Sequence, residues 1–230
     1  MCGRTSLFAP EPEIERRFEA AFDHDYERRY NVAPGSTLAV VHDADPGTIT
    51  RDGWGFVPEW ADSLEAGPRP INARAESLEE TDLFRSAVEN RRALVLADGY
   101  YEWAGTRGGK QPYRIAMEEG DLFAMAGLWS RVHVEKHPHT TVAVVTRNAT
   151  ERLSHIHDRM PAILDRDAES AWLEGPPERA TSLLGPAPDQ RLEATPVSTL
   201  VNDPANDSPA VIEGVGGDSG QTGLEDFGAD

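Results

Sequence analysis

The sequence predicts an α+β protein built on a curled, largely antiparallel β-sheet. Apolar runs of strand length recur along the chain, helical patterns are few and short, and the two do not alternate as in βαβ units. The length of 230 residues suits one large domain, which we place at residues 1–213. Residues 214–230 are rich in Gly and Asp and lack Lys and Arg, so we expect a disordered acidic tail there.

Helices are expected where apolar residues recur at helical spacing. Ile14, Phe18 and Phe22 fall four residues apart and predict a first helix over 10–22. Further helices are expected at 77–90, 167–173 and 178–184. Strands are expected at 37–41, 49–51, 53–57, 92–97, 98–103, 112–117, 122–129, 140–146 and 192–197. Loops or turns are expected at 30–35, 58–70, 104–110 and 154–161.

The charge is strongly acidic. The formal net charge is −18, and Lys110 and Lys136 are the only lysines. We interpret this surface as an adaptation to concentrated salt in the cytoplasm of a halophile. It argues against a generic nucleic-acid binder, which would be basic, but not against a local arginine-lined groove. Because salt weakens phosphate contacts, a DNA-binding protein of this kind would depend on stacking and covalent chemistry.

Composition excludes further classes of protein. One cysteine rules out a disulfide framework and a zinc–cysteine cluster. No apolar run approaches the roughly 18 residues of a membrane helix, and the polar N-terminus is not a signal peptide. We therefore expect a cytoplasmic monomer that needs no cofactor and has no contact with membranes.

The first four residues, Met1-Cys2-Gly3-Arg4, carry the most informative pattern. Removal of Met1, which is usual before a small side chain, would make Cys2 N-terminal. Its α-amine and thiol, with reference pKa values of about 8 and about 8.5, are both partly deprotonated at neutral pH. An aldehyde can then react twice, giving an imine with the amine and a thiazolidine with the thiolate. The alternative is a cysteine that only packs as a small hydrophobe.

Asn72 and Arg74 lie in a loop just before the helix expected at 77–90. The Asn72 amide could fix the Cys2 amine by a hydrogen bond, although helix capping would also explain an Asn here. The Arg74 guanidinium could bind a phosphate with two parallel hydrogen bonds.

Glu102 lies among Tyr100, Tyr101 and Trp103 at the end of an apolar strand. Poor solvation there would raise its pKa towards neutrality and suit it to proton transfer. The alternative is an edge-strand Glu whose carboxylate stays in water.

His157 lies between Ile156 and Asp158 and could relay protons near neutral pH. His155 is close in sequence, but no third ligand is apparent, so we do not expect a metal site. Trp60 lies in a Pro-bounded loop, where an exposed indole could stack on a base or wedge between base steps. Packing of Trp60 on the core is the alternative.

Together these stretches resemble the SRAP family (SOS-response-associated peptidase, also called HMCES-like proteins). The blocks follow one another in the order of the family and cover roughly residues 1–213. The matching blocks are Met1-Cys2-Gly3-Arg4, Tyr30–Gly35, Trp54-Gly55, Ile71–Glu76, Ala97–Trp103, Lys110-Gln111-Pro112, Ala126–Trp129, Val145-Thr146, Ile156–Pro161 and Pro196-Val197-Ser198 through Asn202.

The resemblance implies a barrel-like SRAP fold and a sensor of abasic sites in single-stranded DNA. The mature Cys2 would couple to the ring-opened aldehyde of the abasic sugar, giving a thiazolidine DNA–protein crosslink that shields the lesion. Asn72 would orient the Cys2 amine, and Glu102 would shuttle protons during imine formation and ring closure. His157 would protonate the sugar oxygen to favour the open aldehyde. The family name also implies autoproteolytic exposure of the cysteine, although only Met1 precedes it here.

The resemblance also implies the contacts with DNA. Arg4, Arg74 and Arg159 match positions suited to phosphate, and Thr146 would line the same pocket. Trp60 would stack or wedge. Members of the family often have two adjacent aromatic residues in this loop, whereas Ala61 follows Trp60 here, so the preference for a strand junction is open.

Other classes of function remain open at this point. An N-terminal-nucleophile glutamine amidotransferase would use the Cys2 thiol on an amide with its own amine as base. A non-catalytic single-strand-binding module would function equally well without the Cys2 thiol. Crosslinking to abasic DNA separates both from the function that the resemblance implies.

Overall fold

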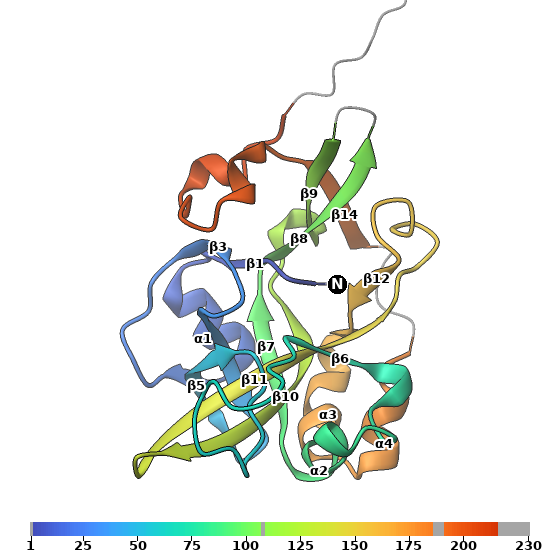
Figure 1. Cartoon of the computed structure of the whole chain (residues 1–230). Coiled ribbons are helices and arrows are strands. Elements are labelled where there is room, and N and C mark those ends of the chain that lie inside the picture. The colour runs from blue at the N-terminus through green and yellow to red at the C-terminus, as the bar shows by residue number, and fades with distance from the viewer. Residues whose placement is uncertain (1, 107–108, 186–190, 216–230) are drawn as a thin grey trace, which may run out of the picture.

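The computed structural model describes residues 2–106, 109–185 and 191–215. Within this part of the chain, a β-barrel closes through two kinds of pairing (Figure 1). Its strands are β4 (Thr37–His42), β5 (Asp45–Trp54), β7 (Arg92–Ala97), β10 (Phe123–Val134) and β11 (His137–Asn148). Antiparallel ladders run in the order β11-β10-β7-β4-β5, and a parallel pairing of β5 with β11 closes the ring. The expected α+β, barrel-like fold is confirmed.

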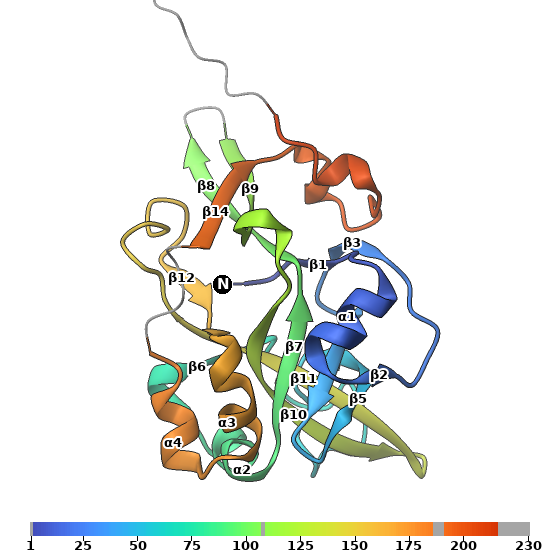
Figure 2. The same cartoon turned by 180° about the vertical axis from the view of Figure 1, so that it is seen from behind.

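A second sheet crosses one end of the barrel (Figures 1 and 2). It has the order β14-β9-β8-β1-β3, formed by Leu192–Pro196, Gly109–Met117, Gly99–Thr106, Thr5–Leu7 and Arg29–Val32. Short strands extend the barrel sheet: β6 (Asn72–Arg74) and β12 (Arg159–Pro161) pair with β11, β13 (Ile163–Leu164) with β10, and β2 (Ala21–Phe22) with β5.

The helices pack on the outside of the barrel (Figure 2). They are α1 (Glu11–Phe18), α2 (Asp82–Asn90), α3 (Glu169–Glu174) and α4 (Pro177–Ser182). Short 3₁₀ turns lie at η1 (Ala75–Ser77), η2 (Glu118–Gly120), η3 (Arg166–Ala168), η5 (Thr199–Asn202) and η6 (Pro209–Val211).

Strand β7 and the central parts of β10 and β11 are buried on both faces, which explains their continuous apolar runs. Side chains such as Leu94 and Val145 pack with the helical residues Phe84 and Trp172 and therefore face outward. Their neighbours in the sequence, such as Val95 and Val144, point to the other face and fill the barrel. This interior cluster continues to Cys2, Tyr100 and Ile115, which close one end of the barrel. Strands β8 and β9 thus cover this end of the barrel interior.

Close approach inside the barrel explains Gly127. A Cβ at this position would lie 2.9 Å from Val95 Cγ2 and 3.3 Å from Val142 Cγ2, which belong to the two neighbouring strands. Any larger residue would push β10 away from them.

The predicted first helix was too long. The structure ends α1 at Phe18, because Glu19 adopts a left-handed conformation with φ of 53°. The chain then turns, and Phe22 lies in β2 beside Ile49 rather than on the helix. The helix expected at 77–90 begins at Asp82 instead, after the η1 turn.

Several predicted strand boundaries were also wrong. The strand expected at 49–51 and the start of the one expected at 53–57 belong to the single strand β5, which ends at Trp54, so residues 55–57 are not in a strand. The loop expected at 30–35 contains the end of β3. The hairpin loop expected at 104–110 is shorter, because β8 extends to Thr106 and β9 begins at Gly109. The turn expected at 154–161 ends in β12. Backbone pairing that local composition did not reveal set these boundaries: β3 pairs with the distant β1, whereas β8 and β9 extend each other within one hairpin.

The N-terminal segment is fixed by strong polar contacts. Strand β1 lies between β3 and β8, and Tyr101 N donates to Arg4 O at 2.9 Å. The buried Arg4 guanidinium donates to Asn31 Oδ1 at 2.7 Å and to the carbonyl oxygen of Val201. Asn31 Nδ2 in turn donates to Asn206 O at 2.8 Å. These bonds join the two ends of the described domain.

The C-terminal end of the domain continues past β14. Gly214 forms an isolated bridge with Val197, and Val215 N donates to Pro196 O at 3.0 Å. Most of the expected acidic tail, residues 216–230, lies outside the described residues.

We predict that Asn31→Ala lowers the free energy of unfolding by about 2–4 kcal/mol. The substitution leaves the buried Arg4 guanidinium and several carbonyl oxygens short of hydrogen-bond partners. Urea denaturation measures the change. Asn90→Ala, at an exposed position, is the matched control and should change stability by less than about 0.5 kcal/mol. Equal stabilities of the two variants would contradict the assigned role of Asn31.

Candidate active site

Cys2 lies at the closed end of the barrel, with no exposed surface. Asn72 Nδ2 donates a hydrogen bond of 2.9 Å to the Cys2 carbonyl oxygen, which fixes the backbone of the second residue. Burial raises the pKa of the Cys2 thiol far above its ordinary value, and the negative charge of Glu102 raises it further. The sulfur is therefore a neutral thiol in the resting protein.

Glu102 lies on β8 and is buried, with 4% of its surface exposed. The expected desolvation is present: burial raises the pKa of Glu102 to about 7. The charges of Asp158 and Lys110 also act on this carboxyl, with opposite signs. A carboxyl with this pKa exchanges protons in either direction near neutral pH.

His157 comes from the loop between β11 and β12, and its neighbour Ile156 packs in the same cluster as Cys2. The Arg159 backbone N–H lies in position to donate to His157 Nδ1 at 2.9 Å, which favours the tautomer with its proton on Nε2. Asp158 Oδ1 at 3.0 Å and Arg159 O at 3.3 Å also face Nδ1 and favour the other tautomer. Burial lowers the pKa of His157, which favours the neutral imidazole.

Strand β6 places Asn72 and Arg74 at the site. Its parallel pairing with β11 sets Asn72 beside Val144 and Arg74 beside Thr146. Asn72 is therefore not a helix cap, and the loop expected here is a short strand. Asn72 Oδ1 is buried and has no hydrogen-bond partner among the described residues. The Arg74 side chain is exposed, and no hydrogen bond or ion pair joins it to another described residue.

Arg159 is held in place by an ion pair with Glu76. Its guanidinium donates to both Glu76 carboxylate oxygens, at 2.7 and 3.0 Å, and to Thr146 O at 2.8 Å. Hydrogen bonding to Arg159 lowers the pKa of Glu76. The sequence reasoning missed the role of Glu76. Glu76 lies two residues after Arg74 and four after Asn72, and this closeness in sequence could have marked it as a residue of the site. Its contact with Arg159 is visible only in the structure.

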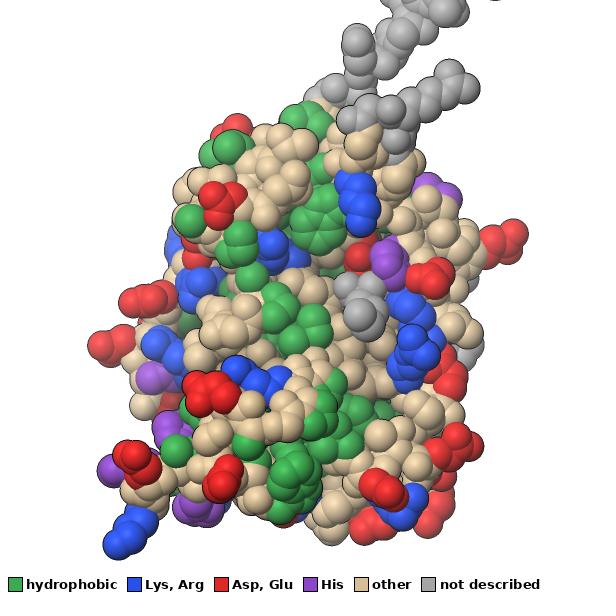
Figure 3. Space-filling model, in the orientation of Figure 1, with side chains coloured by type: hydrophobic (Ala, Val, Ile, Leu, Met, Phe, Trp, Pro, Cys, Tyr) green, Lys and Arg blue, Asp and Glu red, His purple; other side chains and the backbone are tan. Residues whose placement is uncertain are grey.

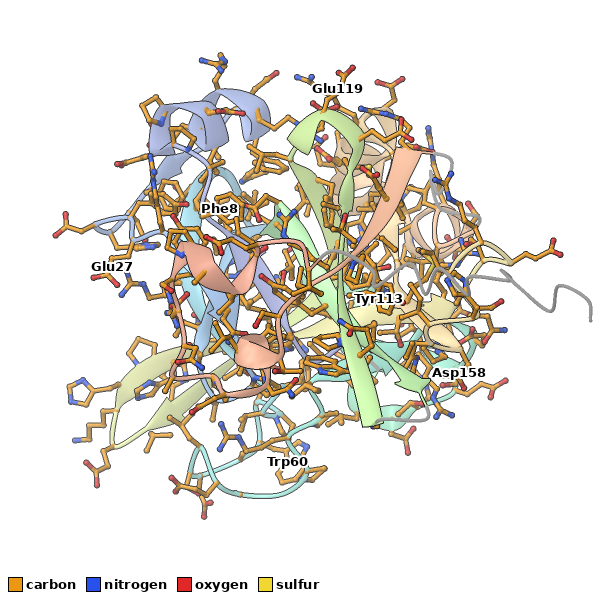
Figure 4. The ribbon with its side chains drawn as sticks, turned by 90° about the horizontal axis from the view of Figure 1, so that it is seen from above. Phe8, Glu27, Trp60, Tyr113, Glu119 and Asp158 are labelled. Carbon is orange, nitrogen blue, oxygen red and sulfur yellow. The ribbon has the colours of Figure 1, made fainter. Side chains whose placement is uncertain are left out.

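Arg4 and Trp60 do not join the Cys2 cluster. The buried Arg4 guanidinium contacts Asn31 and the C-terminal segment, and it lies 5.6 Å from the centre of the Trp103 ring. A phosphate contact by Arg4 stays a prediction. Trp60 is 73% exposed, as a stacking or wedging residue requires. Figure 4 shows Trp60 and Asp158 on different loops at separate edges of the molecule, with Tyr113 of β9 nearer the centre of the view.

The chain is acidic overall, but cations lie near the site. On the face shown in Figure 3, Lys and Arg side chains form several separate groups, with Asp and Glu side chains both among them and at the edges. Arg74 and Lys110 are exposed cations near the site residues.

In the described part of the chain, no three His, Cys, Asp or Glu side chains come together as metal ligands. None of the helices described there is long and apolar enough to cross a membrane.

The family model described as SOS response associated peptidase (SRAP) matches residues 1–204. The chain therefore belongs to the SRAP family. It is similar to "Abasic site processing protein YoqW" of Bacillus subtilis (strain 168), being 37% identical over 93% of this chain and 99% of that protein. "Abasic site processing protein HMCES" of Gallus gallus is 34% identical over 92% of this chain and 77% of that protein. The corresponding YedK protein of Escherichia coli (strain K12) is 29% identical over 94% and 100%.

Solved structures share the fold. A protein from Bacteroides thetaiotaomicron has a TM-score of 0.84 at 24% identity, covering 93% of this chain and 100% of that one. A phage-related protein from Bordetella bronchiseptica has a TM-score of 0.69 at 26% identity, covering 85% of this chain and 94% of that one.

We predict that Glu102→Gln stabilises the protein increasingly as the pH rises from 4.5 to 7. The folded-state pKa of about 7 lies above the ordinary value of 4.5, so in this window the unfolded chain binds fewer protons than the folded one. Wild-type stability therefore falls as the pH rises, by up to about 3 kcal/mol at pH 8, and Gln escapes this loss. Urea denaturation across the range measures the difference.

Glu193→Gln, which changes an exposed carboxyl on β14, is the matched control and should show no such trend. A stability difference between Glu102→Gln and wild type that stays constant from pH 4.5 to 8 would contradict the raised pKa.

Proposed function

We propose that this chain processes abasic sites in single-stranded DNA by forming a covalent crosslink. Once Met1 has been removed, the Cys2 α-amine attacks the C1′ aldehyde of the ring-opened sugar. The resulting imine then takes up the Cys2 thiol to give a thiazolidine. The reaction needs no cofactor, because the chain supplies both nucleophiles and the DNA supplies the electrophile.

The observation that carries the proposal is the environment of Cys2. The residue that becomes N-terminal is held by Asn72 and lies beside a carboxyl with a pKa of about 7. Membership in the SRAP family and the names of the similar proteins, which are called abasic site processing proteins, support the same substrate.

The pKa values indicate an order of steps. Because burial keeps the Cys2 sulfur as a thiol, the amine is the first nucleophile and attacks the aldehyde. Condensation releases one water. Near pH 7 Glu102 is partly ionised, so it can give a proton to the departing hydroxyl and later accept the thiol proton.

Asn72 and His157 complete the proposed chemistry. The Asn72 carbonyl oxygen is suited to accept a hydrogen bond from the Cys2 amine, while its Nδ2 holds the Cys2 backbone. With its proton on Nε2, His157 is suited to donate to the sugar ring oxygen and favour the open aldehyde.

The residues proposed to contact DNA do not contribute equally to binding. Arg74 is the cation on which phosphate binding depends most, because Arg159 already shares its charge with Glu76. Trp60 presents an exposed indole for base stacking. Its neighbour Ala61 is 6% exposed and supplies no second wedge. The overall charge of −18 suits a cytoplasm rich in salt, where a covalent bond compensates for weak phosphate attraction.

We predict that the purified protein, in high salt, forms a denaturation-resistant adduct with an oligonucleotide that carries one abasic site. Its intact mass should equal the protein without Met1 plus the oligonucleotide minus one water. Cys2→Ala should give no such adduct, and an oligonucleotide with a tetrahydrofuran in place of the aldehyde sugar should give none with wild type. Folded wild-type protein that lacks Met1 and yields no adduct overturns the proposal, and glutamine hydrolysis is then the activity to assay.

We predict that Arg74→Gln weakens binding to single-stranded DNA and makes the logarithm of affinity less dependent on the logarithm of salt concentration, with a slope smaller by about 0.7. The substitution removes one phosphate contact without altering the buried residues of the site. Fluorescence anisotropy over a range of salt concentrations measures the slope. Arg85→Gln, on α2, is the matched control, and a slope equal for both variants would argue against Arg74 as a phosphate contact.

A further inference from the structure

The hydroxyl of Tyr100 is buried without a hydrogen bond. The residue is 1% exposed, and its hydroxyl oxygen has no partner among the described residues. Buried hydroxyls of this kind are rare, because leaving the group unpaired forfeits the bonds it would make in water. A phenylalanine would fill the same place without this cost. The hydroxyl therefore needs an explanation other than packing.

The register of the sheet directs Tyr100 to the active site. On β8, Tyr100 and Glu102 are two residues apart, so their side chains project from the same face of the strand. Tyr100 belongs to the apolar cluster that contains Cys2. Tyr101 projects from the opposite face and packs with Val197 and Val201.

The electrostatic surroundings agree with this position. Burial raises the pKa of Tyr100 well above its ordinary value, and negative charge on Cys2 and then on Glu102 raises it further. Both groups are thus near enough for their charges to act on the hydroxyl. Tyr100 therefore stays protonated throughout the working pH range. Its hydroxyl can donate a hydrogen bond, but it does not transfer its proton.

The reaction creates a group that needs such a donor. The buried Cys2 thiol becomes a thiolate when it adds to the imine, and burial opposes that charge. Within the described residues, the Arg4 backbone amide is a donor that already favours the thiolate. We propose that the Tyr100 hydroxyl donates a second hydrogen bond to the Cys2 sulfur as ring closure proceeds, which makes Tyr100 a further catalytic residue. This inference rests on the proposed crosslinking function.

The step balances without another reactant. The thiol proton passes to the Glu102 carboxylate, and the sulfur forms a bond to C1′ of the imine. The π electrons of the C=N bond move to nitrogen, which takes up the proton that Glu102 received from the thiol. Tyr100 keeps its own proton and only stabilises the charge on sulfur. Imine formation, which involves the amine alone, does not use the Tyr100 hydroxyl.

The test is Tyr100→Phe, which removes one oxygen atom. Wild type and variant, both lacking Met1, are mixed with the abasic oligonucleotide and sampled over time with and without sodium borohydride. Borohydride reduces the imine to a stable amine that is heavier than the thiazolidine adduct by two hydrogen atoms. We expect the variant to form the imine at the wild-type rate and to close the ring about tenfold more slowly, so that trapped imine accumulates.

Stability separates this role from a structural one. Tyr100→Phe should melt at the wild-type temperature or above it, because the lost hydroxyl had no partner among the described residues. Tyr101→Phe is the matched control: its hydroxyl donates to Tyr30 O at 2.6 Å, so the variant should melt at a lower temperature and close the ring at the wild-type rate.

The outcomes are distinguishable. If wild type gives no adduct at all, the proposed function fails. If wild type gives the adduct and Tyr100→Phe closes the ring equally fast, the inference about Tyr100 is wrong and the proposed function stands. If imine formation and ring closure slow by the same factor, the hydroxyl acts through Glu102, and its assignment to the sulfur is overturned. A lower melting temperature for Tyr100→Phe would mean that the hydroxyl is structural.

Discussion

The fixing of the first few residues at the end of the barrel is the constraint on which the rest of the site depends. A chain terminus is normally mobile, yet Cys2 has no exposed surface. The Asn72 bond to Cys2 O and the buried contacts of Arg4 with Asn31 and Val201 hold it there. Because β1 also pairs with β8, the same contacts set the distance from Cys2 to the side chains of β8.

Burial then determines the chemistry of these side chains. It raises the pKa of Cys2 and Glu102 and lowers that of His157, so each group favours its neutral form. Of these groups, Glu102 has a pKa near the working pH and therefore exchanges protons at little cost. The proposed crosslinking uses this property, and its cost is the lower stability expected from ionised Glu102.

The charges outside the site affect how the protein approaches DNA. A chain with a net charge of −18 repels DNA over long distances, but salt screens that repulsion beyond about one Debye length, roughly 8 Å at physiological salt and about 3 Å at 1 M. Close contacts then decide binding. The exposed Arg74 and Trp60 can make such contacts, and the Glu76–Arg159 pair holds the neighbouring strands in place. The proposed covalent bond to the lesion does not depend on long-range attraction between the protein and DNA.

The sequence by itself determined the fold class and the poor solvation of Glu102, because local composition carries these properties, and it predicts the reactive pair at Cys2. It could not show that Asn72 bonds to Cys2, that Glu76 pairs with Arg159, or that Tyr100 shares a buried cluster with Cys2. Those relations depend on strand pairings between segments that are far apart in the chain, such as β6 with β11 and β1 with β8. The end of α1 at Glu19 was missed for the same reason, since the pairing of β2 with β5 overrides helical spacing. Local patterns specify which residues are buried, and only the closed barrel decides which of them meet.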